Sequence, residues 1–152
     1  MVNWLIKILA LLSGAVHAAG IPSDSKSNAG KGFTQANCDK SHKLYVETLP
    51  GFIPTAAQKW PCSYAGHLSS SPTNDSHQLF FWLYPANEKA GEDAPLIVWL
   101  NGGPGASSFL ANFLFSGPLR IARDSDKPVG EQYELYTVAE NWTNVGSVVY
   151  LD

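Results

Sequence analysis

The sequence predicts an α/β fold built around the core of a large sheet, and three observations support that prediction. The runs 79–84 and 96–100 are aromatic and aliphatic stretches bounded by proline and polar residues, which is typical of strands buried on both faces. The run 148–151 is a third strand of the same kind. Between the last two, apolar residues recur at helical spacing from Ser107 to about Phe115, and Gly117-Pro118 ends the pattern.

The composition is that of a folded protein. The 152 residues are 45% hydrophobic and 12% aromatic, with a formal net charge of -3. This balance predicts one modest domain, or part of a larger one, rather than a disordered tail. Because no block of Lys or Arg occurs, we expect neither a nucleic-acid partner nor a polybasic membrane contact. The cysteine spacing matches no zinc or redox motif, and we expect no metal and no cofactor.

Residues 1–18 have the pattern of a signal peptide. Lys7 accompanies an apolar stretch from Ile8 to Val16, and Val16-His17-Ala18 places small residues where a signal peptidase inspects them. A membrane anchor is the alternative, but a spanning helix needs about 20 apolar residues and this stretch is shorter. We therefore expect export without a stable membrane anchor, to an extracellular, vacuolar or lysosomal compartment.

Three other features of the sequence are consistent with an exported protein. Cys38 and Cys62 would meet an oxidising compartment, where they could close one disulfide. The sequons at Asn74 and Asn141 are candidate glycosylation sites. Residues 19–43 contain a polar stretch rich in Ser, Lys, Asn and Gly, which predicts a flexible leader or propeptide. The structured part of the chain is expected to span residues 44–152.

Two more segments complete the expected organisation. Residues 63–68 predict a short strand, and the stretch from Arg120 to Glu140 is polar with turn signals, which predicts a surface excursion. The last strand, around Tyr150, has no helix after it to cover it. We therefore expect its backbone to be exposed and to promote aggregation.

The segment Asn101-Gly102-Gly103-Pro104-Gly105 forms a glycine-rich turn between the second strand and the helix. Glycines there allow main-chain N–H groups to face a cavity without obstruction by Cβ, and the following helix N-terminus favours negative charge. That geometry suits the oxyanion of an acyl-transfer reaction. The alternative is a tight strand-to-helix turn without chemistry, and the longer string around the glycines favours the catalytic interpretation.

The string Trp99-Leu100-Asn101-Gly102-Gly103-Pro104-Gly105-Ala106-Ser107-Ser108, followed by Gly117-Pro118, resembles the signature of the serine carboxypeptidase family, peptidase S10. Residues 63–68, 77–84 and 142–152 are similar to strand motifs of the same family in the same order. The resemblance implies the α/β-hydrolase fold with a central mixed sheet. This chain would be its N-terminal part, ending before the turn that carries the nucleophilic serine.

The resemblance also implies roles for individual residues. The backbone N–H of Gly103 would be one oxyanion donor. The Asn101 side chain and the Gly102 N–H would bind the C-terminal carboxylate of a substrate, with Trp99 behind them. In the family, acid side chains that share a proton with the substrate carboxylate favour acidic pH.

Two positions depart from the family pattern. Ala106 stands where a cysteine is usual, and Phe115 stands where a glutamate of the carboxylate-binding network is common. Phe115 thus puts the usual carboxylate recognition and pH dependence in question.

The catalytic triad of Ser, Asp and His is absent from this chain. No Gly-x-Ser-x-Gly pattern occurs, so the triad motifs would lie beyond Asp152, and the 152 residues alone are expected to be inactive. We interpret Ser107 and Ser108 as helix-start residues. The histidines His42, His67 and His77 are interpreted as surface or strand residues.

Three functions are compatible with these features. The leading one is a serine-type carboxypeptidase that removes residues from peptide or protein C-termini through an acyl-enzyme. The others are a noncatalytic secreted binding module derived from the family, and an esterase or acyltransferase on the same scaffold. Whether a full-length product pairs into a homodimer is not written in the sequence.

Overall fold

The computed structural model describes residues 34–69, 78–91, 93–129 and 132–152. The signal peptide, His77 and the sequon at Asn74 lie outside the described residues, as does most of the leader. The leader segment that is described, 34–43, is tied to the rest of the molecule. Thr34 forms a β-bridge with Ala86, and the turn η1 (Gln35–Asn37) follows it.

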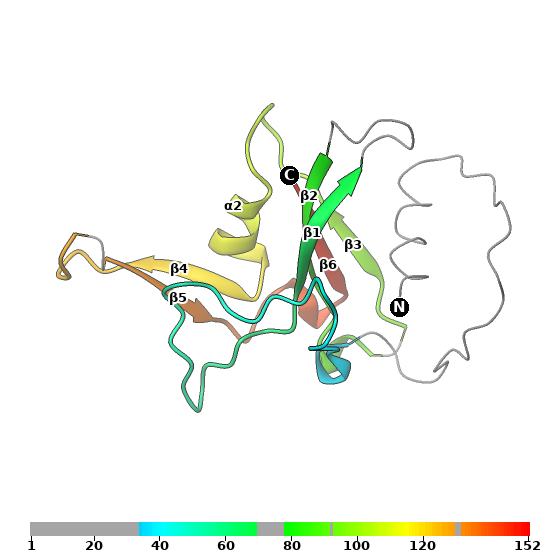
Figure 1. The fold of residues 1–152 in the computed structure, drawn as a ribbon, viewed down its shortest axis with the longest axis horizontal. Helices are drawn as coiled ribbons and strands as arrows, with labels where there is room; N and C mark the ends of the chain where they lie inside the picture. The colour runs from blue at the N-terminus through cyan, green and yellow to red at the C-terminus, as the bar shows by residue number, and fades with distance from the viewer. Residues whose placement is uncertain (1–33, 70–77, 92, 130–131) are drawn as a thin grey trace, which may run out of the picture.

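A four-stranded mixed sheet forms the body of the molecule (Figure 1). Its strands are β1 (Tyr64–Ser69), β2 (Gln78–Tyr84), β3 (Leu96–Trp99) and β6 (Ser147–Leu151), in the order β1-β2-β6-β3. The pairs β1–β2 and β2–β6 are antiparallel, whereas β3 and β6 are parallel. All four strands lie close to the ranges that the apolar runs predict, which confirms those predictions.

The position of β6 corrects one expectation. We expected the backbone around Tyr150 to be exposed, but β6 lies between β2 and β3, pairs with both, and is buried along its whole length. Among the described strands the sheet edges are β1 and β3. Accordingly β3 is only half-buried rather than buried on both faces, and Leu100 just after it is exposed. The reason is that a strand's neighbours depend on non-local pairing, which an apolar run does not encode.

The segment 120–140 is a second correction, because it is more than a surface excursion. It contains the antiparallel strands β4 (Leu119–Arg123) and β5 (Tyr133–Thr137), which form a two-stranded sheet. In Figure 1 this hairpin extends away from the four-stranded sheet. Half of its residues are polar or charged. Apolar content alone therefore does not reveal it.

Both faces of the four-stranded sheet are packed. Trp82, Tyr84, Val148 and Tyr150 point to one face, and their strand neighbours point to the other, as the alternation of a strand requires. The other face is formed by Phe81, Leu83, Val149 and Leu151, packed against Leu44, Leu68, Leu96 and Val98.

The predicted helix covers the first of these faces. It begins as α2 (Phe109–Ala111) and continues as the wider turn η3 (Asn112–Ser116). Phe109 and Phe113 pack against the sheet, whereas Leu110 and Leu114 are exposed. Two of the four apolar residues at helical spacing therefore pack against the sheet, and the other two face solvent.

The end of the helix is a crowded position. The Gly117 N–H donates to Asn112 O, and a Cβ placed on Gly117 would lie 1.9 Å from Asn112 Oδ1 and 2.5 Å from Asn112 O. The Arg120 guanidinium then donates to carbonyl groups of the helix, Phe115 O at 2.6 Å and Asn112 O at 3.4 Å, and also to Leu119 O at 3.0 Å at the start of β4. A cation at a helix C-terminus satisfies carbonyls that have no partner within the helix.

We predict that Gly117→Ala destabilises the fold by about 1 to 3 kcal/mol, the usual cost of forcing an extra methyl group into a packed site. The matched control is Gly102→Ala, where an added Cβ meets nothing within 4 Å. Urea unfolding followed by tryptophan fluorescence measures both. Equal midpoints for the two variants would contradict the close approach of Asn112 to Gly117.

Candidate functional site

The glycine-rich turn lies where the sequence places it, between the end of β3 and the start of α2. Residues Gly102, Gly103, Pro104 and Gly105 are exposed. Gly103 has φ 151° and Gly105 has φ 86°, values that side chains with a Cβ rarely adopt. The backbone course of the turn therefore depends on glycine at these two positions.

The N–H groups of Gly102 and Gly103 are available to an external acceptor. Neither donates a hydrogen bond to another residue in the part of the chain that the structure describes. A Cβ on Gly102 would also meet nothing within 4 Å, so the space beside this residue is open. Two adjacent exposed donors are a suitable site for a carbonyl or carboxylate oxygen.

Asn101 is held on both sides. Its main-chain N–H donates to Ser108 Oγ at 3.1 Å, and its Oδ1 accepts from Trp99 Nε1 at 3.4 Å. The side-chain NH₂ group has no partner among the described residues, which leaves two donors beside the glycines.

Trp99 belongs to a group of three rings beside the turn, here named the aromatic wall: Trp99, Phe115 and Trp142. The Trp99 ring meets Trp142 edge-on at 5.1 Å and Phe115 edge-on at 6.0 Å. Phe115 is 55% exposed and Trp142 42% exposed, so both rings are also open to solvent. The wall is apolar and carries no ionisable group. The sequence analysis placed Phe115 at a position of the carboxylate-binding network, whereas it did not assign Trp142 to the site.

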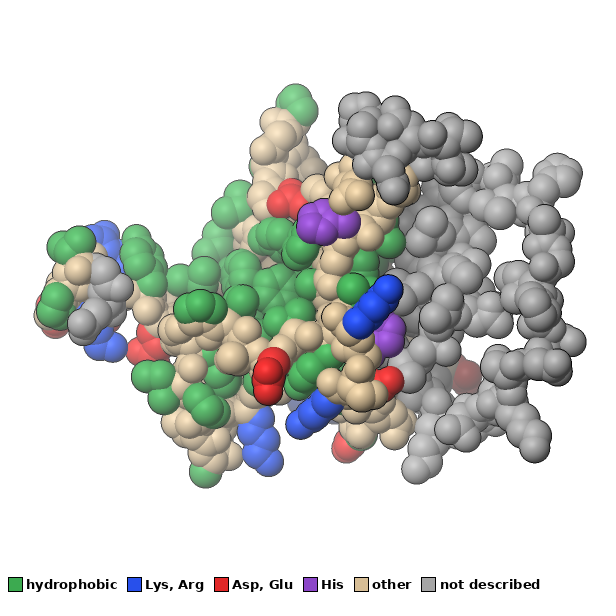
Figure 2. Space-filling view, in the orientation of Figure 1, with side chains coloured by type: hydrophobic (Ala, Val, Ile, Leu, Met, Phe, Trp, Pro, Cys, Tyr) green, Lys and Arg blue, Asp and Glu red, His purple; other side chains and the backbone are tan. Residues whose placement is uncertain are grey.

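The space-filling view shows where this apolar surface lies in the wider molecule. In Figure 2, hydrophobic side chains gather in the region of α2 and between α2 and the β4–β5 hairpin. Charged side chains lie mostly around that region rather than within it.

Ser107 and Ser108 lie at the helix start, as predicted. Ser107 Oγ donates to Asp152 Oδ2 at 2.6 Å and accepts from the Phe109 N–H at 3.2 Å. The Ser108 N–H donates to Asp152 Oδ1 at 3.2 Å. These contacts join the segment after the glycine turn to the end of β6, and sequence reasoning missed Asp152 because no local signal marks it.

The described histidines pack on aromatic rings. His67 lies in β1 with its ring 5.2 Å from that of Phe80, and His42 lies 5.6 Å from the ring of Tyr64. The interpretation of His67 as a strand residue is consistent with this position. Among the described residues, no group of three or more His, Cys, Asp or Glu side chains is placed to hold a metal ion.

Two buried phenols lie under the helix and take a structural role. The Tyr84 hydroxyl accepts from Asn112 Nδ2 at 3.1 Å, and the Tyr150 hydroxyl lies 2.9 Å from Ser116 Oγ. Burial raises the pKa of Tyr150 to about 12 and the pKa of Tyr84 well above its ordinary value. Both phenols therefore anchor the helix through these buried hydrogen bonds.

Cys38 and Cys62 are joined in a disulfide, with Cα atoms 5.8 Å apart. The bond joins Cys38, which follows the turn η1, to Cys62, which lies two positions before the start of β1. The Gln35 side chain reinforces the same junction, because it accepts from the Cys62 N–H at 2.6 Å and donates to Cys62 O at 3.0 Å.

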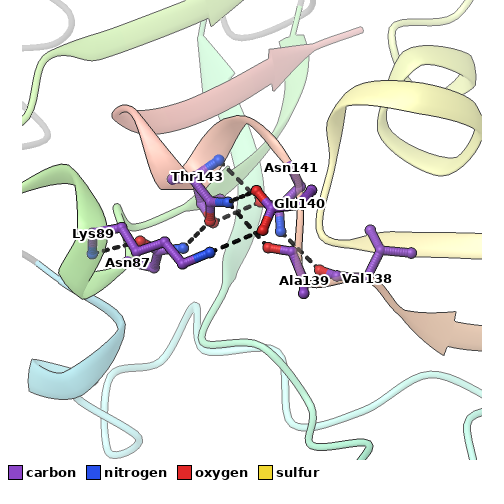
Figure 3. A network of polar contacts seen from close by, with 8 residues as sticks. Asn87, Lys89, Val138, Ala139, Glu140, Asn141 and Thr143 are labelled. Carbon is purple, nitrogen blue, oxygen red and sulfur yellow. Dashed lines mark hydrogen bonds and ion pairs between the residues drawn. The ribbon is translucent and has the colours of Figure 1, made fainter.

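Asn141 of the second sequon is a capping residue of the turn η4 (Trp142–Asn144) (Figure 3). Its Oδ1 accepts from the N–H and the hydroxyl of Thr143, at 3.0 and 2.6 Å, and its Nδ2 donates to Val138 O at 2.9 Å. Thr143 is only 2% exposed. All polar atoms of the Asn141 side chain are thus used within the chain, and glycosylation there stays a prediction.

A second set of contacts around η4 fixes it to the turn η2 (Glu88–Ala90) that precedes β3. The Asn87 N–H donates to Thr143 O at 2.8 Å, and Lys89 Nζ lies 3.0 Å from Glu140 Oε1 (Figure 3). This exposed ion pair and the Asn144 side chain lower the pKa of Glu140. These contacts hold the N-terminal ends of β3 and β6 next to each other.

Comparison with known proteins agrees with the resemblance. The family model described as serine carboxypeptidase matches residues 54–152. Serine carboxypeptidase S10 family member 2 of Dictyostelium discoideum is 44% identical over 92 residues, which are 59% of this chain and 16% of that protein. The carboxypeptidase Y homolog of Arthroderma benhamiae is 42% identical over 122 residues, 80% of this chain and 22% of that protein.

A third relative, the pheromone-processing carboxypeptidase KEX1 of Candida glabrata, is 38% identical over 108 residues. The match covers 68% of this chain and 14% of that relative. The chain thus spans between 14% and 22% of the length of these three curated relatives.

We predict that Asn141→Ala lowers the free energy of unfolding by about 1 kcal/mol, because it removes the cap of η4. Asn141→Ser is the matched control, since its hydroxyl oxygen keeps an acceptor for the Thr143 N–H and places no second oxygen against Val138 O. Both variants abolish the sequon equally. Chemical denaturation that ranks the two as equally destabilised would contradict the capping role.

Proposed function

The chain belongs to the serine carboxypeptidase family, and from this premise we propose that it forms the oxyanion- and carboxylate-binding part of an exopeptidase. The reaction is the release of C-terminal residues from peptides through an acyl-enzyme. The observation that supports this most directly is the pair of exposed, unpartnered N–H groups at Gly102 and Gly103, at the end of a sheet strand and before a helix.

Gly103 supplies an oxyanion donor in this proposal. The carbonyl oxygen of a peptide gains negative charge when a nucleophile adds to its carbon, and a fixed N–H directed at that oxygen lowers the barrier. Loss of one such donor costs about 10²- to 10³-fold in kcat. The second donor of this fold comes from the residue after the nucleophilic serine, and these 152 residues contain no nucleophile turn.

Asn101 and Gly102 hold the substrate's terminal carboxylate. The Asn101 NH₂ group and the Gly102 N–H are neutral donors on neighbouring residues, and the bond from Trp99 Nε1 to Asn101 Oδ1 directs the amide so that its NH₂ end is free. Trp99 thus supports the site from behind through a hydrogen bond as well as through its ring.

The aromatic wall sets the character of the space beside these donors. Phe115 presents a ring where the family often carries an acid, so no side chain of the wall can share a proton with a carboxylate. Recognition then depends on neutral donors, and we expect it to be less dependent on acidic pH than in relatives that carry the acid. The exposed rings favour an apolar terminal residue in the substrate.

We propose that the chain works in a compartment of the secretory pathway. The Cys38–Cys62 disulfide supports an oxidising compartment of the secretory pathway, extracellular, vacuolar or lysosomal. The described ranges contain no candidate membrane-spanning helix. The partners in this proposal are the C-termini of peptides or proteins.

We predict that Gly103→Ala in a full-length product lowers kcat for a blocked dipeptide by roughly 10²-fold or more, comparable to loss of an oxyanion donor. A Cβ there would lie 3.0 Å from the Ala106 N and would strain a φ of 151°, so the turn must shift. Gly51→Ala is the control, because Gly51 also has a positive φ and open space around it but precedes the sheet. Unchanged kcat in the Gly103 variant would remove the oxyanion role.

The 152-residue chain itself should release no amino acid from the same dipeptide, because it has no Gly-x-Ser-x-Gly nucleophile turn. Sequencing of the full transcript distinguishes the enzyme from a noncatalytic module. A reading frame that continues into a nucleophile turn supports the enzyme, and a stop codon after Asp152 supports the module. Hydrolysis of esters without release of free amino acid would instead indicate an esterase.

A further inference from the structure

Asp152 follows β6 directly, and the neighbouring strand β2 fixes its backbone. Its N–H donates to Phe80 O at 2.9 Å, and its carbonyl oxygen accepts from the Phe80 N–H at 2.8 Å. Because both main-chain groups are held in the ladder, the direction of its Cα–Cβ bond is set by the sheet. The carboxylate is therefore carried on a rigid support.

Both oxygens of this carboxylate contact the segment between the glycine turn and α2. Oδ2 accepts from Ser107 Oγ at 2.6 Å, and Oδ1 accepts from the Ser108 N–H at 3.2 Å. Hydrogen bonds to an ionised acceptor are roughly twice as strong as those between neutral groups. The carboxylate also satisfies one N–H at the helix start, where the backbone has no partner of its own.

Ser108 transmits this constraint to the other end of the turn. Its hydroxyl oxygen accepts from the Asn101 N–H at 3.1 Å, and the residue is buried. The turn is thus bridged between Asn101 before it and Ser108 after it. The exposed glycines between these two points have few contacts of their own, so their orientation depends on where the bridge is held.

We propose that Asp152 is a positioning residue for the glycine turn. Through Ser107 and Ser108 it fixes the direction of the Gly102 and Gly103 N–H groups relative to the end of the sheet. The inference rests on the proposed function of those N–H groups. The contacts of Asp152 with Ser107 and Ser108, here named the lock, are a structural property that can be measured without catalysis.

The test compares the 152-residue chain with Asp152→Asn by NMR. Asparagine keeps the size of the side chain and removes its charge, so the N–H of Ser108 should exchange with solvent roughly tenfold faster or more. The amide resonances of Gly102 and Gly103 should shift, whereas the exchange of Trp82 and Tyr150 in the central strands should stay unchanged.

The control is Asp126→Asn, which makes the same charge change on the exposed β4–β5 hairpin. The exposed Asp126 side chain makes no hydrogen bond or ion pair with a described residue, so this variant should leave all these signals unchanged. Ser107→Ala is a second variant, because it keeps the charge and removes the bond to Oδ2, together with the acceptor of the Phe109 N–H. The double variant should exchange no faster than Asp152→Asn alone, since both changes act through one lock.

Three results would overturn the proposal. They are an unprotected Ser108 N–H in the parent chain, equal acceleration of exchange across the central strands, and unshifted glycine resonances in both variants. Should Asp152→Asn not fold, the Ser107→Ala variant decides alone by the same signals. An intact lock together with no peptidase activity in a full-length product would refute the proposed function and leave the positioning role standing.

Discussion

The parallel pairing of β3 with β6 determines where every other part of the candidate site lies. Its register runs from Leu96 opposite Ser147 to Trp99 opposite Tyr150. Parallel strands end at the same edge of a sheet, so the residues after Trp99 and after Tyr150 emerge side by side. The start of the pairing is equally restricted. A Cβ on Gly146 would lie 2.5 Å from Pro95 O, where only glycine permits so close an approach.

This pairing also explains the helix that covers the sheet. The face of β2 and β6 beneath the helix is aromatic, and two of its rings are tyrosines whose hydroxyl groups need partners when buried. Asn112 and Ser116 supply them, and Ser116 Oγ also donates to Ala111 O at 3.0 Å within the wider turn. The helix is therefore fixed by apolar packing and by polar contacts together, which directs Phe115 toward Trp99.

The parts that could be predicted from sequence are those with a local signal. Continuous apolar runs gave the strands, and the glycine string gave the turn, because both patterns reflect burial and backbone geometry within a few residues. The place of β6 inside the sheet, the polar hairpin and the contacts of Asp152 could not be found this way. Each depends on residues distant in sequence: Asp152 meets Ser107 across 45 positions. The chemistry of a single exposed aspartate is uninformative until the sheet brings it to the turn.

The proposed function assigns two tasks of an acyl-transfer site to different parts of the structure: stabilisation of charge to the turn, and selection of the substrate to the aromatic wall. Charge on a reacting oxygen requires donors that do not reorient during the reaction, and the proposed donors are main-chain groups on a turn that follows β3 and contacts Asp152 at the end of β6. Selection of the substrate requires surface rather than charge, and in the proposal the aromatic wall supplies that surface. Two rings of the wall, Phe115 and Trp142, lie outside the turn, so in this proposal the preferred terminal residue can change without a change in the residues that carry the donors. A site divided in this way allows specificity to vary while the turn stays constant.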